Sequence, residues 1–182
     1  VYKFIQQFYS NLDYYIPDRY NEGYGISKKG VDYAAETGVG LIIVLDCGIK
    51  AVEEITYAKE KGMTVIVTDH HEVQEELPPA DAVVDHKQEE CGYPFKGLCG
   101  AGVAFQLIGA LYEKEGISPD EREDLLEYAA IATVADVMEL KGENRGLVKS
   151  GLRALEHTKN TGLRALLEVQ ELSGKELEAY HI

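Results

Sequence analysis

The chain has 182 residues, of which 45% are hydrophobic and 27% charged, a composition typical of a globular protein with a sizeable core. No apolar stretch approaches the roughly 20 residues that a membrane-spanning helix needs. The net charge of −14 argues against a uniformly basic nucleic-acid-binding surface, because phosphate backbones attract Lys and Arg. The three cysteines, Cys47, Cys91 and Cys99, form no Cys-x-x-Cys pair, which favours free thiols and a cytoplasmic protein.

The acidic residues are unevenly distributed along the chain. Residues 1–71 carry a net charge of −3, residues 72–139 carry −12, and residues 140–182 carry +1. The acids concentrate in 72–90 and 113–127, which we interpret as a solvated loop and a solvated helix face. Any track for nucleic acid is therefore expected elsewhere in the protein.

The first half of the chain alternates helical patterns with short apolar runs. The expected helices are 1–9, 28–36 with Ser27 as its cap, and 50–61. The expected strands are an aromatic strand 12–16 closed by Pro17, then 41–45, 64–68 and a weaker 82–84. This alternation predicts βαβ units and a parallel Rossmann-like sheet over about residues 1–86.

The second half of the chain has mainly helical patterns. The expected helices are a buried helix 100–113, a helix from about Asp120 opened by Ser118-Pro119, then 145–156, and 162–169 capped by Thr161. The predicted fold class is α/β. A parallel Rossmann-like sheet is flanked by helices in the first part, and a helical layer occupies about residues 97–182.

Acidic residues and a histidine pair follow three of the apolar runs. Asp46 follows 41–45, the triplet Asp69-His70-His71 follows 64–68, and Asp136 follows 130–135, which we interpret as a further strand end. In open α/β sheets, ligands bind beyond the carboxyl ends of the strands. Carboxylates combined with imidazole suit Mn²⁺, and carboxylates suit Mg²⁺. The three ends together predict divalent-metal chemistry on a phosphate.

Each of these residues has a predicted role and a simpler alternative. The candidate metal ligands are Asp46, His70 and Asp136. His71 is a candidate for a phosphate contact, and Asp69 is a candidate for orienting a neighbouring imidazole. Taken alone, an Asp after a strand is usually a helix N-cap, and a lone His is usually a satisfied polar group. Taken together, metal binding explains the set better.

The remaining candidates have weaker settings. Asp85 follows the short strand 82–84, where a turn residue is a better explanation than a fourth ligand. We interpret His86, His157 and His181 as surface residues.

These motifs resemble a known superfamily. Asp46-Cys47-Gly48, Asp69-His70-His71 and the segment 133–136 are similar to the successive motifs of the DHH phosphoesterases. Within that superfamily, the chain most resembles the RecJ-type single-strand-specific exonucleases. This narrower resemblance rests on six further segments, which are Pro17-Asp18-Arg19, Glu22-Gly23-Tyr24-Gly25, Tyr93-Pro94-Phe95-Lys96, Gly100–Phe105, Asn144-Arg145 and Gly151-Leu152.

The resemblance implies a function and a cofactor. It implies that Asp46, His70 and Asp136 bind Mn²⁺ or Mg²⁺, two ions in the intact enzyme, with His71 and Asp69 completing the catalytic site. It implies 5′-to-3′ removal of nucleotides from single-stranded DNA in DNA repair and recombination, with partners among DNA-repair proteins left unidentified. Arg19 is the candidate for substrate contact, although a solvated surface role competes with it.

Two features of the family are not found in residues 1–182. The first motif, an Asp-x-Asp pair, would lie before Val1, and the DHH-associated domain would lie after Ile182. We therefore expect a DHH domain that lacks both, binds one metal ion or none, and has little activity by itself. Two alternatives remain, namely a DHH enzyme for small substrates (an oligoribonuclease, a cyclic-dinucleotide phosphodiesterase or a pyrophosphatase) and a non-catalytic replication scaffold.

Overall fold

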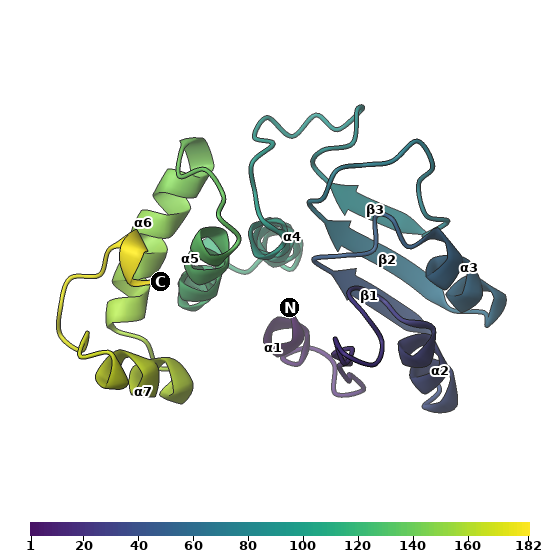
Figure 1. Cartoon of the computed structure of the whole chain (residues 1–182), viewed down its shortest axis with the longest axis horizontal. Helices are drawn as coiled ribbons and strands as arrows, with labels where there is room; N and C mark the ends of the chain where they lie inside the picture. The colour runs from purple at the N-terminus through teal and green to yellow at the C-terminus, as the bar shows by residue number, and fades with distance from the viewer. The chain divides into compact units, whose positions relative to one another are not determined.

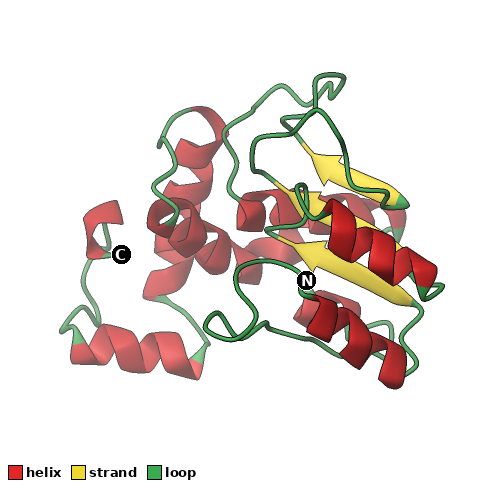
Figure 2. Ribbon diagram, turned by 45° about the vertical axis from the view of Figure 1, so that its right-hand side comes forward, coloured by secondary structure: helices red, strands yellow, loops and turns green.

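The computed structural model describes residues 1–182, except the side chains of 119–121. The chain divides into two compact units, Val1–Lys96 and Gly97–Ile182. The first unit contains the sheet and the second is helical (Figures 1 and 2). The predicted α/β class is confirmed. Among the described residues, none of the helices combines the length and the hydropathy that crossing a membrane requires.

The sheet of the first unit has three parallel strands. They are β1 (Leu41–Leu45), β2 (Thr64–Asp69) and β3 (Ala82–Asp85), in the order β1-β2-β3. Leu45 pairs with Thr68 across the first two strands, so β1 and β2 end at the same edge of the sheet. The arrows of Figure 1 point to that shared edge. The parallel topology predicted from the alternation of helices and strands is confirmed.

Two helices cover one side of this sheet. They are α2 (Lys28–Glu36) and α3 (Val52–Glu60) (Figures 1 and 2). Their apolar residues and those of the strands form one buried cluster, namely Val31, Ala34, Val44, Ile55, Ala58, Met63, Val65 and Val67. Each fully buried aliphatic side chain of this kind contributes about 1.5–3 kcal/mol. As predicted, Ser27 caps α2, because its Oγ accepts the Gly30 N–H at 3.0 Å.

The second unit is built from helices. These are α4 (Gly100–Lys114), η1 (Pro119–Leu125), α5 (Leu126–Ala135), α6 (Gly142–Glu156), α7 (Thr161–Val169) and η2 (Ala179–His181). α5 and α6 approach closely at Gly151, where a Cβ atom would collide with Ala130 and with the Leu126 backbone. The cap of α7 is Asn160 and not Thr161, because Asn160 Oδ1 accepts two backbone N–H groups at 2.9 and 3.1 Å.

Four predicted elements differ from the structure in whole or in part. Residues 130–135 belong to helix α5, since their alanines favour a helix that starts earlier, at Leu126. Residues 12–16 form no strand, and Tyr14, Tyr15 and Ile16 are exposed. The first helix, α1, is limited to Tyr2–Ile5. The helix predicted from Ser118-Pro119 falls partly on 119–121, whose side chains lie outside the described residues; the backbone there is the 3-10 helix η1.

Candidate metal centre

Asp46 lies in a strained turn directly after β1. Its φ is 61°, in the left-handed region that non-glycine residues rarely adopt, and its N–H donates to the Thr68 carbonyl at 2.9 Å. Gly48 follows with φ 106°, and a Cβ there would lie 2.9 Å from Val44 Cγ1. The N-cap of α3 is Ala51, so the Asp46 carboxylate is not the helix cap that its position alone would suggest. The turn therefore leaves this carboxylate half-exposed at the end of the strand.

The acid–histidine cluster consists of Asp46, Asp69, His70 and His71, and Asp69 is its buried anchor. Its side chain is 1% exposed, and its Oδ2 accepts the Ile49 N–H at 2.9 Å from the loop after β1. Its Oδ1 accepts the His70 N–H at 2.7 Å and the His71 N–H at 3.3 Å. Burial by itself would raise the pKa of Asp69, but the hydrogen bonds from Ile49, His71 and His70 outweigh it and hold the pKa below its usual value.

The ionised Asp69 sets the orientation of the His71 ring. His71 Nδ1 lies 2.6 Å from Asp69 Oδ1, and because the carboxylate only accepts, Nδ1 carries the proton and donates. The other ring nitrogen, Nε2, is then the one left with a lone pair for a ligand. This is the contact that an orienting carboxylate requires, and the role itself stays a prediction.

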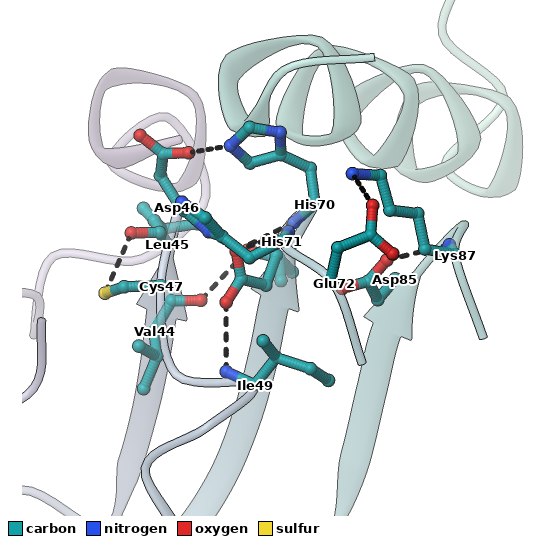
Figure 3. Close-up of polar contacts among 12 residues, drawn as sticks. Val44, Leu45, Asp46, Cys47, Ile49, His70, His71, Glu72, Asp85 and Lys87 are labelled. Atoms are coloured by element: carbon teal, nitrogen blue, oxygen red, sulfur yellow. Dashed lines mark hydrogen bonds and ion pairs between the residues drawn. The ribbon is translucent and has the colours of Figure 1, made fainter. Parts of the chain in front are cut away.

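The structure brings His70 and Asp46 together across two neighbouring strands. His70 Nε2 lies 3.2 Å from Asp46 Oδ1, and Figure 3 shows the two side chains pointing toward each other from the ends of β2 and β1. The His70 side chain is 8% exposed and that of Asp46 is 58% exposed, so the pair opens to solvent on the carboxylate side. Ligand atoms of Asp69, His70 and His71 also lie within 4.8 Å of one another.

A loop of the first unit brings Arg19 and Tyr24 to the same place. The Tyr24 hydroxyl donates to the Asp46 carbonyl at 3.1 Å, and its ring meets the His71 ring edge-on at 6.2 Å. The Arg19 guanidinium lies 5.5 Å from the centre of the Tyr24 ring. The candidate substrate contact thus belongs to a loop in contact with the acid–histidine cluster.

Asp85 and His86 at the end of β3 were only partly anticipated. Asp85 pairs in register with Asp69, and its Oδ1 accepts the Lys87 N–H at 2.8 Å, as a turn residue does. Burial raises its pKa. The prediction that His86 lies at the surface is wrong, since the residue is 5% exposed and burial lowers its pKa. Nothing in the sequence indicated that His86 would be buried, because a polar residue after a short strand is usually exposed.

Asp136 lies in the second unit, at the C-terminal end of α5, and not at a strand end as predicted. It is exposed, and its N–H donates to the Ala132 carbonyl at 2.9 Å. The next residue, Val137, has φ 56° and ends the helix, an unusual conformation for a β-branched residue. The assignment of Asp136 as a metal ligand stays a prediction.

A parallel α/β sheet with an acid–histidine cluster at its carboxyl edge defines the class of domain. Residues 1–133 match the model of the DHH family, N-terminal domain, and the chain belongs to this family. It is 47% identical over 165 residues to the single-stranded-DNA-specific exonuclease RecJ of Bacillus subtilis, covering 91% of this chain and 20% of that relative.

Solved structures agree with this placement. A crystal structure of exonuclease RecJ bound to manganese matches with a TM-score of 0.79 and 39% identity, covering 91% of this chain and 41% of that one. The structure of RecJ in complex with Mn²⁺ from Thermus thermophilus matches with a TM-score of 0.71 and 37% identity, covering 85% and 23%. The chain therefore spans less than half of each of these proteins.

Proposed function

We propose that this chain is the DHH domain of a single-strand-specific exonuclease that hydrolyses phosphodiester bonds of single-stranded DNA. The observation that carries the proposal is the pairing of Asp46 and His70 at 3.2 Å across neighbouring strand ends. The buried Asp69 beside them holds the His71 ring. The similarity to relatives named single-stranded-DNA-specific exonuclease supports the substrate.

The donor set fits a divalent cation such as Mn²⁺ or Mg²⁺. An exposed carboxylate and an imidazole nitrogen face each other, and relatives have been crystallised with Mn²⁺ and with Mg²⁺. Asp46 and His70 would hold such an ion, with Asp136 as a further ligand. When bound, divalent ions polarise the phosphate and make water a better nucleophile.

The side chains around Asp46 and His70 have separate proposed roles. Asp69 holds the His71 ring through Nδ1, so that Nε2 offers a lone pair to a ligand when the ring is neutral and an N–H to a phosphate when the ring is protonated. Arg19 supplies a positive charge beside the cluster, suited to a DNA phosphate. In a protein with a net charge of −14 such a local charge is needed for substrate to approach.

We further propose that the chain by itself holds one ion weakly or none, and has little activity. Asp46, His70 and Asp136 supply only two carboxylates, whereas two dications each want about six donors and repel each other unless neutralised. We also propose a cytoplasmic location and partners among DNA-repair proteins, both suggested by the kind of relative that the chain matches.

Titration calorimetry of Mn²⁺ tests the metal centre, in the chain itself or, if the chain alone binds none, in a polypeptide that also contains the additional regions of the relatives. Asp46→Asn and His70→Ala should each weaken Mn²⁺ binding at least about tenfold. Asn suits the comparison because it keeps the size of Asp and tolerates a left-handed backbone. The matched control is Glu36→Gln, at an exposed acid of the same unit, which should leave binding unchanged. Unchanged binding in both site variants would contradict the proposal.

The substrate is tested on a polypeptide in which this domain is accompanied by the additional regions that the relatives possess. A long single strand, a dinucleotide and pyrophosphate are compared in Mn²⁺, and strands blocked at the 5′ or the 3′ end test the predicted 5′-to-3′ direction. Preferred cleavage of the long strand supports the proposal. Preference for a small substrate would favour the second type of DHH enzyme, and no hydrolysis would favour a scaffold.

A further inference from the structure

One buried carboxylate organises the loop between Asp18 and Ser27. The Glu22 side chain is 5% exposed. Its Oε2 accepts the hydroxyl groups of Ser27 at 2.5 Å and Tyr15 at 2.8 Å, and its Oε1 accepts the Asp18 N–H at 3.1 Å. The Lys29 ammonium lies 3.7 Å away. Glu22 thus ties together the aromatic segment before the loop, the turn at Asp18 and the cap of α2.

These partners favour an ionised carboxylate, because all three donate to it. The hydrogen bonds, that from Ser27 first and then those from Asp18 and Tyr15, lower the pKa of Glu22 to about 2. Two hydroxyl donors converge on one oxygen and a backbone N–H on the other. An amide in place of the carboxylate removes the charge, and it keeps these contacts only if both hydroxyl groups reverse and accept from its NH₂ group. The Ser27 hydroxyl already accepts the Gly30 N–H, so Gln weakens the network.

The residue two positions later, Tyr24, is the one that touches the acid–histidine cluster. Gly23 and Gly25 on either side have φ values of 84° and 90°, so the loop turns sharply before and after this tyrosine. The Tyr24 hydroxyl donates to the carbonyl of Asp46, the residue whose own backbone is held at φ 61°. Its ring packs edge-on against that of His71.

We propose that Glu22 is a positioning residue for the metal centre, which acts by fixing the loop so that Tyr24 supports Asp46 and His71. The contacts run without a break from the Glu22 carboxylate through the loop backbone to Tyr24 and then to the Asp46 carbonyl. The alternative is that Glu22 only stabilises its own loop. The expected loss of Mn²⁺ affinity rests on the proposed function, whereas the expected change in the backbone around Asp46 and His71 does not.

Glu22→Gln tests the inference, with Glu36→Gln as the matched control. Glu36 is an exposed acid at the end of α2, so its substitution makes the same charge change away from the loop. In the metal-free chain, Glu22→Gln should shift the backbone amide resonances of Asp46 and His71 in ¹H–¹⁵N NMR spectra, and Glu36→Gln should not. Tyr24→Phe, which removes only the hydroxyl, should shift the same two resonances.

Mn²⁺ titrations then complete a double-mutant cycle. Glu22→Gln and Tyr24→Phe should each weaken Mn²⁺ binding about tenfold, and the double variant should be no weaker than the weaker single one, because both act through one contact. Fully additive effects, or unshifted Asp46 and His71 resonances in Glu22→Gln, would overturn the inference. If Glu22→Gln does not fold, Tyr15→Phe takes its place, because it removes one hydroxyl donor to Glu22, and unshifted Asp46 and His71 resonances there overturn the inference as well.

The two proposals fail in different ways. If the wild-type chain alone binds no Mn²⁺, as the proposed incomplete site allows, the titrations are made on the polypeptide that also contains the relatives' additional regions, and shifted amide resonances at Asp46 and His71 in Glu22→Gln still support the positioning role. If Mn²⁺ binds and Glu22→Gln changes neither the resonances nor the affinity, the metal proposal stands and the positioning role is overturned.

Discussion

Asp69→Asn offers the sharpest test of how the acid–histidine cluster is held. The Asp69 carboxylate is 1% exposed and accepts one N–H from Ile49 on Oδ2, and groups of His70 and His71 on Oδ1. Asn keeps the shape but has only one acceptor oxygen. Whichever way the amide turns, its NH₂ group faces a backbone or ring donor.

The magnitude follows from these contacts. Leaving one buried N–H unsatisfied costs about 1–3 kcal/mol, and replacing charge-assisted hydrogen bonds by neutral ones costs about 1 kcal/mol more. We therefore expect Asp69→Asn to lower the free energy of unfolding of the first unit by about 2–4 kcal/mol. That is a large share of the roughly 5–15 kcal/mol by which domains are stable.

Urea unfolding and amide hydrogen exchange provide the assay. Because the chain has two compact units, the exchange of β2 amides is needed to report on the first unit separately. Glu36→Gln, at an exposed site of the same unit, is the control and should change stability by less than about 0.5 kcal/mol. A loss below about 1 kcal/mol in Asp69→Asn would refute the reasoning, since it would mean that the buried carboxylate could be neutralised without leaving a donor unsatisfied.

Three further predictions concern acid stability and backbone strain. Stability should fall as the pH is lowered from about 4.5 toward 2, because the pKa values of Glu22 and Asp69 are lowered in the folded chain. In acid titrations followed by circular dichroism, Glu22→Gln should make this loss of stability less steep. A slope unchanged by Glu22→Gln would contradict the assignment. Gly48→Ala should destabilise the chain by about 2–4 kcal/mol in urea unfolding, because its Cβ would press on Val44 in a left-handed backbone; an unchanged midpoint would argue against this packing. Val137→Gly should stabilise by up to about 1 kcal/mol, because the residue is 88% exposed and only its φ of 56° is strained, whereas a loss of stability would show a packing role.

The sheet was predictable because its sequence signals are local. Runs such as 41–45 and 64–68 are short, apolar and bounded by turn residues, and the helices between them require parallel neighbours. Once the strands are parallel, their carboxyl ends meet at one edge. The proximity of Asp46 to His70 follows from this topology, although their function as ligands stays a prediction.

The errors have equally physical causes. A six-residue apolar run such as 130–135 is compatible with a strand or a buried helix, and its alanines together with the upstream Leu126 decide for the helix. The aromatic run 12–16 has the composition of a strand, but a strand also needs a partner with which to pair, and none of the three strands of the sheet takes it. The burial of His86 depends on the fold around it, which its own position in the sequence does not reveal.

Positive φ angles occur at one predicted ligand, Asp46, and directly after another, Asp136. Among the described residues, three non-glycine positions have a positive φ, namely Asp46, Val137 and Glu171. Glu171 follows the end of α7, where a left-handed residue is common. The other two are a predicted ligand and the residue that follows one, Asp136. An aspartate tolerates the left-handed region, but a β-branched valine does so at a cost, and strain of this kind persists mainly where a site needs it. Val137 nevertheless ends α5 with the same backbone hydrogen-bond pattern by which Glu171 ends α7, so the helix terminus explains its conformation. The positive φ of Asp46 has no such explanation, because Asp46 follows a strand, whereas the role of Asp136 stays a prediction.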